Sequence, residues 1–112
     1  MKAEALKGHL DGMLHACLEA GPRHGYAIIE ALRAGSGGQF ELPTGTVYPA
    51  LRRLERAGLI KGTWAEHGGR RRRVYRLTAG GRRALENQRA SWRTFSAAVT
   101  ALLDRPGRPA TS

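Results

Sequence analysis

The sequence predicts a mainly α-helical domain with one small β-hairpin, an α+β fold, followed by one long helix. Three observations predict it. Before residue 58, three segments place apolar residues three and four apart, as amphipathic helices do. The apolar period then changes to two on either side of a glycine pair, which is typical of a hairpin. After residue 78, an apolar pattern with seven-residue spacing continues to residue 103.

The composition limits the kinds of protein that the chain can be. Its 112 residues suffice for one domain with a modest core, and 41% of them are hydrophobic. The single cysteine, Cys17, excludes an internal disulfide, and a buried thiol is expected there. No metal, cofactor or acid–base pair is indicated, so an enzyme is not expected. There is neither a membrane-length apolar run nor a secretory signal, which predicts a cytoplasmic protein.

The first two helices follow from their apolar faces. A helix over residues 3–20 is expected, with Gly21 and Pro22 ending it. A second helix begins after residue 24 and ends in the glycine-rich residues 35–38. Residues 40–42 are expected to form a short extended strand. The apolar face of the first helix consists of Leu6, Leu10, Met13, Leu14, Cys17 and Leu18.

A third helix follows Pro43, with Thr44 as its expected N-cap. Pro49 is tolerated best in a first turn, so the helix is expected to start close to Thr46. Gly58 is expected just past its end as a C-cap. Its buried stripe consists of Val47, Leu51 and Leu54.

The hairpin and the last helix complete the predicted domain. Residues 60–65 alternate with period two, residues 67–69 form a glycine turn, and residues 70–77 return as a strand. Thr78 is the expected N-cap of a helix that runs to about Leu103, with Gly80 and Gly81 as a weak point near its start. The expected organisation is a winged helix-turn-helix domain over 1–77, a dimerisation helix over 78–103 and a disordered tail over 104–112.

The charge favours a nucleic-acid partner. Lys and Arg number 19 against 9 acidic residues, for a net charge of +10, and 16 of the 19 are arginine. Residues 40–77 hold nine basic and three acidic side chains, a net +6 in a third of the chain. A basic surface without a partner, or a compositional bias toward arginine, is the alternative on charge alone.

Five motifs cover most of residues 6–103 in order: LKG at 6–8, GPRHGY at 21–26, GTVYPAL at 45–51, LERAGLI at 54–60 and RVYRLT at 73–78. Together they resemble the PadR family of bacterial transcription regulators, in its short form with one helix after the wing. The resemblance implies a homodimeric regulator that binds double-stranded DNA, usually a repressor, located at the nucleoid when bound. It also implies a response to small aromatic ligands, as in many relatives.

Three groups of residues are expected to contact DNA. A recognition helix offers its N-terminal turns and one exposed face to the major groove. The wing arginines follow a glycine turn and can reach a minor groove, although Arg71 and Arg73 share the face of Tyr75 and one of them can lie along the protein. Each group also has an alternative interpretation. Tyr48 can be a ring of the core, His24 can cap a helix, and the arginine run can be a solvated edge of the sheet. The candidates are Thr44, Thr46, Tyr48 and Arg52 in the third helix, Arg70, Arg71 and Arg72 in the wing, and Arg23, His24 and Tyr26 before and in the second helix.

The heptads of the last helix predict that it pairs with a second copy. A two-fold dimer would bind an inverted repeat. Trp92 and Phe95 are also candidates for binding a planar aromatic effector, with a plain dimer core as the alternative. A protein-interaction module on the same scaffold and a constitutive DNA-binding factor remain as rival functions. The predicted dimerisation residues are Leu10, Leu14, Leu85, Trp92, Phe95, Val99 and Leu102.

Overall fold

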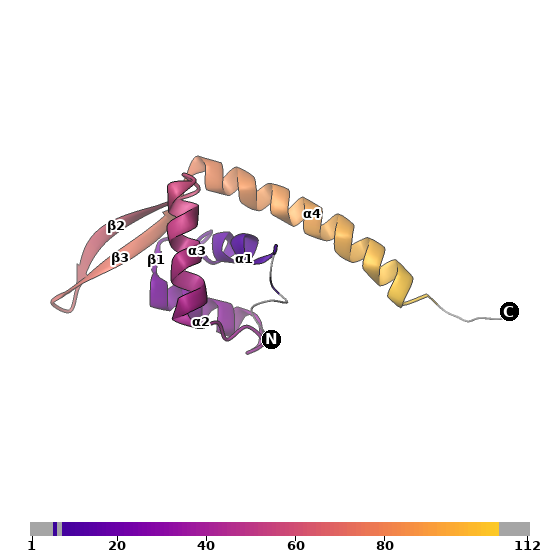
Figure 1. Cartoon of the computed structure of the whole chain (residues 1–112), viewed down its shortest axis with the longest axis horizontal. Helices are drawn as coiled ribbons and strands as arrows, with labels where there is room; N and C mark the ends of the chain where they lie inside the picture. Colours follow the sequence, from indigo (N-terminus) through magenta and orange to yellow (C-terminus); the bar gives the residue numbers. More distant parts are fainter. Residues whose placement is uncertain (1–5, 7, 106–112) are drawn as a thin grey trace, which may run out of the picture.

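The computed structural model describes residue 6 and residues 8–105, and its fold is the mainly helical α+β architecture that the sequence predicts. Helices α1–α3 form a small bundle, the β2–β3 hairpin projects from one side, and α4 leads away from the other (Figure 1). The expectations for residues 3–5, 7 and 106–112 lie outside the described residues. The elements are α1 (Leu10–Cys17), β1 (Arg23–His24), α2 (Gly25–Gly35), α3 (Thr44–Arg56), β2 (Ile60–His67), β3 (Arg70–Leu77) and α4 (Ala79–Leu103).

The core lies between the three helices and the base of the hairpin. The α3 stripe is buried as predicted, with Val47, Leu51 and Leu54 at most 1% exposed. Leu14 from α1 and Ile28 from α2 are fully buried beside it. Within the described residues, no helix is long and apolar enough to cross a membrane.

Helix α1 is shorter than the predicted residues 3–20. It begins at Leu10, because Gly8 has a φ of +90°, which a right-handed helix cannot include. At the other end, Leu18 is the C-cap and its N–H bonds to the carbonyl of His15 in a tightened last turn. The apolar spacing extended into these flanking turns, so it overstated the length of the helix.

Helix α3 begins two residues earlier than predicted. Pro43 is the N-cap, and Thr44 is the first helical residue rather than the cap. Pro49 therefore lies inside the helix, where it cannot donate to the carbonyl of Gly45. The C-terminal prediction is confirmed, because Gly58 follows the C-cap with a φ of +77°.

The sheet has three antiparallel strands in the order β1-β3-β2. Residues 40–42 form no strand, which corrects the prediction; the third strand is the two-residue β1, where Arg23 pairs with Tyr75. Two residues are too few to show an alternating pattern. The predicted hairpin is confirmed, and the φ values of Gly68 (58°) and Gly69 (78°) are both positive, as a type I′ turn requires.

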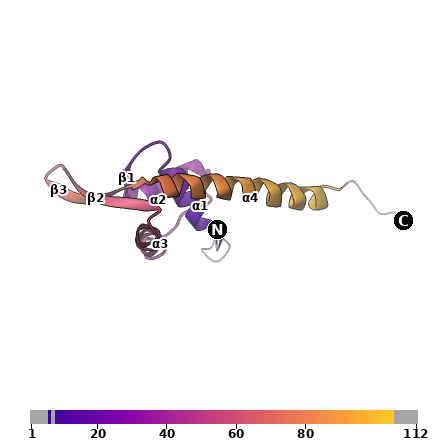
Figure 2. The ribbon, with the colours of Figure 1, turned by 90° about the horizontal axis from the view of Figure 1, so that it is seen from above.

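Helix α4 is fixed to the domain at its start. The Thr78 hydroxyl accepts from the N–H of Gly81, which confirms the predicted cap, and donates to the carbonyl of Gly58 (2.7 Å). Gly81 packs so closely on the chain that a Cβ there would lie 2.0 Å from the carbonyl oxygen of Leu59. Gly81 is thus a required contact and not only a weak point in the helix. Seen from above, α4 then runs away from α3 and the hairpin (Figure 2).

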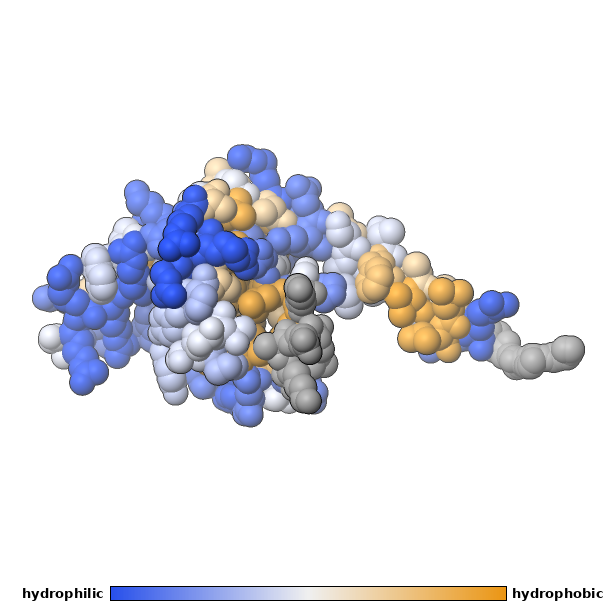
Figure 3. Space-filling model, in the orientation of Figure 1, coloured by the Kyte–Doolittle hydropathy of each residue, from blue (hydrophilic) through white to orange (hydrophobic). Residues whose placement is uncertain are grey.

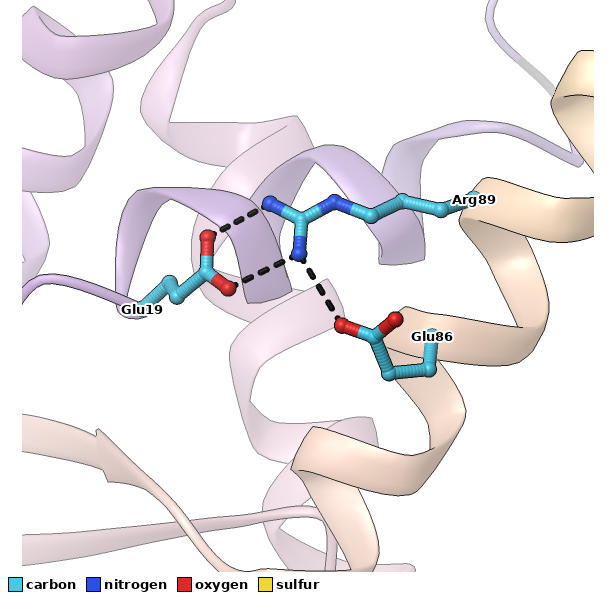
Figure 4. A network of polar contacts seen from close by, with 3 residues as sticks. All are labelled: Glu19, Glu86 and Arg89. Atoms are coloured by element: carbon cyan, nitrogen blue, oxygen red, sulfur yellow. Dashed lines mark hydrogen bonds and ion pairs between the residues drawn. The ribbon is translucent and has the colours of Figure 1, made fainter.

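Polar contacts join the first turns of α4 to α1. The Arg89 guanidinium binds both carboxylate oxygens of Glu19 and also reaches Glu86, one turn earlier (Figure 4). Beside this network, Nδ1 of the buried His15 lies 3.0 Å from the amide oxygen of Gln88. These contacts hold the N-terminal half of α4 on the domain.

Candidate nucleic-acid interface

The N-terminal half of α3 places the predicted recognition residues at different depths. Thr44 is exposed and Thr46 is half-buried. The Tyr48 ring is also half-buried and lies against α2, where a Cβ on Gly25 would come within 2.6 Å of its hydroxyl oxygen. Gly25 therefore makes room for the ring. The alternative interpretation of Tyr48, as a ring packed against the core, describes its position best.

The arginines of α3 differ in their partners. Arg53 forms a two-point ion pair with Asp11 of α1, with N–O distances of 2.9 and 2.6 Å. Arg52 and Arg56 are exposed, and neither forms an ion pair or a side-chain hydrogen bond within the described part of the chain. Arg53 is used to hold α3 against α1, so the cations of α3 that remain available to a ligand are Arg52 and Arg56.

The residues before and in α2 have mixed roles. The Arg23 guanidinium donates to the carbonyl of Cys17 (2.7 Å), which ties β1 to the end of α1. Burial raises the pKa of the Cys17 thiol, so this group is an unreactive neutral thiol at neutral pH. Tyr26 is 62% exposed in the first turn of α2 and presents its ring to solvent.

His24 caps α2 and contacts the wing. Its Nδ1 accepts from the N–H of Ala27 (3.1 Å), and its Nε2 lies 2.8 Å from a guanidinium nitrogen of Arg72. Burial and then the charge of Arg72 lower the pKa of His24, which favours the neutral ring. A neutral ring that accepts at Nδ1 carries its proton at Nε2, where it meets the Arg72 donor unfavourably. Arg72 is therefore held weakly and can turn to an anion.

The wing, residues 60–77, carries basic side chains on both faces. Arg70 is exposed at the end of β3 and has no ion pair among residues 8–105. Arg71 and Arg73 lie over the ring of Trp64, at 4.8 and 5.4 Å from its centroid. The alternation predicted that one of this pair lies along the protein, and Arg73 does so. Figure 3 shows the hydrophilic side chains that cover the wing.

No pattern in the sequence indicates what fixes the wing to α3. Glu55 of α3 accepts from the Arg73 guanidinium and from the N–H of Gly62 in β2 (3.2 Å). Arg73 occupies the space beside Gly62, since a Cβ there would lie 2.8 Å from its Nε. Glu55 and Arg73 are 18 residues apart and lie in a helix and a strand, so no sequence spacing predicts that they meet. Only the fold reveals the pair.

The distal part of α4 is apolar and exposed. Trp92 is 53% exposed, and its ring centroid lies 5.4 Å from His9 and 6.1 Å from Phe95. Phe95 and Leu102 are also exposed, and together with Trp92 they form an apolar stripe on the distal part of α4. Figure 3 shows an apolar patch towards the far end of this helix. Val99 is half-buried.

The other predicted dimerisation residues serve the domain itself. Leu14 and Leu85 are at most 3% exposed in the core of the single chain. Leu10 is half-buried against the same core. The first heptad of α4 thus packs on its own domain, while the later heptads extend beyond it.

The arrangement of exposed cations on α3 and the wing can bind anions. Within the described residues, no group of three or more His, Cys, Asp or Glu side chains is placed to hold a metal ion. Exposed guanidinium groups on α3 and the wing can contact phosphate oxygens. Hydroxyls at the start of α3 lie where the helix dipole also favours negative charge.

A three-helix bundle with a two-stranded wing defines a winged helix-turn-helix domain, the class used by many transcription regulators. The chain belongs to the PadR-like family of transcriptional regulators, whose family model matches residues 13–87. This family membership confirms the resemblance seen in the five sequence motifs and the expectation that the chain is a regulator and not an enzyme.

Solved structures share the fold. A PadR-like regulator from Bacillus cereus has a TM-score of 0.81 and 29% identity, over 92% of this chain and 99% of that chain. A PadR family regulator from Clostridium difficile has a TM-score of 0.77 and 33% identity, over 86% and 99%. Bacillus subtilis PadR in complex with operator DNA has a TM-score of 0.64 and 24% identity, over 70% of this chain and 45% of that chain.

Proposed function

We propose that the protein is a homodimeric repressor that binds an inverted-repeat operator and is released by a small planar aromatic ligand. The observation that carries the proposal is the division of α4: its first turns are fixed to the domain, and its later turns carry an exposed apolar stripe. Such a stripe on an extended helix is suited to pairing with a second copy.

DNA is the partner that the charge favours. Most of the exposed cations lie on α3 and the wing, with Arg82, Arg83 and Arg93 on α4, whereas the interiors of protein interfaces are depleted of charge. In this proposal, α3 enters the major groove with Thr44, Thr46 and Arg52, while Tyr48 packs behind them against α2. Arg70, Arg71 and Arg72 reach the flanking groove. Repression follows if a dimer on its operator excludes other proteins from that DNA, in the cytoplasm at the nucleoid.

The dimer is tested by charge insertion on α4. Trp92→Glu combined with Phe95→Glu is expected to abolish dimerisation and to lower operator affinity sharply, because one domain alone loses half of the DNA contact. Ala97→Glu is the matched control, since Ala97 is exposed and lies about half a turn away from the stripe. A double variant that sediments as the wild type does would refute the dimer.

The effector is tested through tryptophan emission. Trp92, Phe95 and His9 bring three rings together on an exposed face, which pairing would place near the seam between two copies. In a Trp64→Phe background the emission comes from Trp92 alone. Planar aromatic compounds are expected to quench it and to release DNA. A broad panel that does neither would support the constitutive DNA-binding factor.

A salt titration separates DNA binding from the protein-interaction alternative. Contacts from several arginines to phosphates predict that duplex affinity falls steeply as the salt concentration rises. A chain that shows no salt-dependent duplex binding would favour the interaction module. A promoter–reporter assay in the presence and absence of the protein then tests the direction of regulation.

A further inference from the structure

Trp64 is an exposed aromatic residue in a basic part of the molecule. It lies in β2, and 58% of its surface is accessible to solvent. Tryptophan is enriched at interaction sites, because its ring is large and apolar and also carries a polar N–H. The wing projects from the side of the domain opposite to the distal part of α4 (Figure 1), so the surface around Trp64 is separate from the proposed dimer stripe.

The indole is held by cations, not by apolar neighbours. The guanidinium groups of Arg71 and Arg73 lie over its ring at 4.8 and 5.4 Å. Arg73 also pairs with Glu55, which neutralises its charge. Arg71 forms no ion pair in the portion of the chain that the structure describes. The indole therefore orients Arg71 and leaves its positive charge available to a ligand.

Trp64 and the two arginines over its ring have a defined position relative to α3. Trp64 pairs with Arg73 across the hairpin, and paired residues share one face of the sheet. That same face leads back through Gly62 and Tyr75 to the core. Glu55 of α3 binds both Arg73 and the N–H of Gly62. The indole is therefore exposed, yet fixed with respect to the proposed recognition helix.

We propose that Trp64 and Arg71 make a joint contact with the sugar–phosphate backbone of duplex DNA beside the wing. The indole packs on the apolar C–H face of a deoxyribose, and the Arg71 guanidinium binds the neighbouring phosphate. Glu55 and Arg73 act as positioning residues that hold this contact at a fixed distance from α3. The inference rests on the proposed function, since it requires that α3 and the wing face DNA.

The first test compares variants of the wing in duplex titrations at two salt concentrations. Trp64→Leu is expected to weaken binding about tenfold, and Trp64→Phe is expected to retain most of the affinity. Arg71→Ala is expected to reduce the salt slope by about one. The double variant is expected to lose less than the product of the single losses, because the two side chains act together. Thr63→Ala, on the other face of the same strand, is the control.

The second test observes Trp64 directly. With 5-fluorotryptophan incorporated, the chain has two fluorine resonances, and that of Trp64 is the one absent from Trp64→Leu. Duplex DNA is expected to shift it, and a single strand of the same length is not. Circular dichroism verifies that each variant is folded.

The outcomes separate this inference from the function on which it rests. If the wild type binds duplex DNA while Trp64→Leu binds within twofold of it, or while the Trp64 resonance stays unchanged, the backbone contact is refuted alone. An equal shift with single-stranded DNA would also overturn it in favour of base stacking. A wild type that binds no duplex would refute the proposed function as well.

Discussion

One added methyl group is expected to have opposite effects at two adjacent glycines of α4. A Cβ at Gly81 would lie 2.0 Å from the Leu59 carbonyl oxygen and 3.0 Å from Cδ2 of Leu77. A Cβ at Gly80 would meet no atom closer than 3.7 Å. Alanine is therefore expected to destabilise the protein at position 81, whereas at position 80 it has room.

The size of the effect follows from what must move. To relieve the overlap, α4 has to shift away from Leu59, whose carbonyl accepts from the N–H of Thr78 (3.2 Å). That shift weakens this hydrogen bond by about 1 kcal/mol and the Thr78 cap by about 1 kcal/mol. Loosened packing of Leu77 and Leu85 adds about 2 kcal/mol.

The helix propensity of alanine works in the other direction. Replacing a helical glycine by alanine raises the free energy of unfolding by about 1 kcal/mol. Gly81→Ala is therefore expected to lower the free energy of unfolding by about 3 kcal/mol. Gly80→Ala is expected to raise it by about 0.5 kcal/mol, since the gain is smaller in a first turn.

Urea unfolding followed by circular dichroism measures both variants. All samples need the same protomer concentration, because dimerisation would make the stability depend on it. In thermal unfolding, Gly81→Ala is expected to lower Tm by more than about 10 °C. If the two alanine variants unfold within about 0.5 kcal/mol of each other, the close approach of Gly81 to Leu59 is wrong.

Arg52→Ala is expected to weaken duplex binding about tenfold without changing the unfolding midpoint, because Arg52 is exposed and makes no ion pair in the described residues. Arg53→Ala is expected to lower the free energy of unfolding by less than about 1 kcal/mol, because its pair with Asp11 is partly exposed; equal losses of DNA binding in both variants would contradict this division. The Arg53 hydrogen bond lowers the pKa of Asp11, so its stabilisation is complete above the ordinary pKa of aspartate and is lost as the pH falls through the lowered value. Urea titrations from about pH 6 to pH 3 are expected to show the wild type approaching Asp11→Asn at the acidic end.

Local chemistry made much of the fold predictable from the sequence. The buried stripe of α3, the glycine turn of the wing and the Thr78 cap each depend on residues close together in the chain. Two of the errors in the fold have different causes, a distant strand partner in one and a local backbone conformation in the other. Strand β1 exists because two residues lie beside β3, and α1 begins late because Gly8 has a positive φ, which its apolar neighbours do not reveal.

The candidate site was less predictable, since the sequence shows where charges are but not which of them are paired. The sequence does not show that Arg53 is bound by an aspartate 42 residues away. The alternation predicted that Arg71 or Arg73 can lie along the protein, and only the fold shows that Glu55 neutralises Arg73. Pairing across the fold therefore divides the cations into those that hold elements together and those left for a ligand.

The same contacts bear on how the proposed dimer would set the spacing of its operator. Helix α3 ends at Arg56, and Leu59, which follows soon after it in the chain, lies so close to the start of α4 that glycine is needed at position 81. Arg89 of α4 binds Glu19, just after the end of α1 (Figure 4), and Gln88 contacts His15 of α1, so α4 is held against this part of the domain. Because α4 is held against the domain both at Leu59 and at Glu19, each α3 helix is expected to move together with its own α4. The two α3 helices of a dimer would then change their separation only if the α4 helices change how they pair. A planar ligand bound among the α4 rings would therefore act on both recognition helices at once.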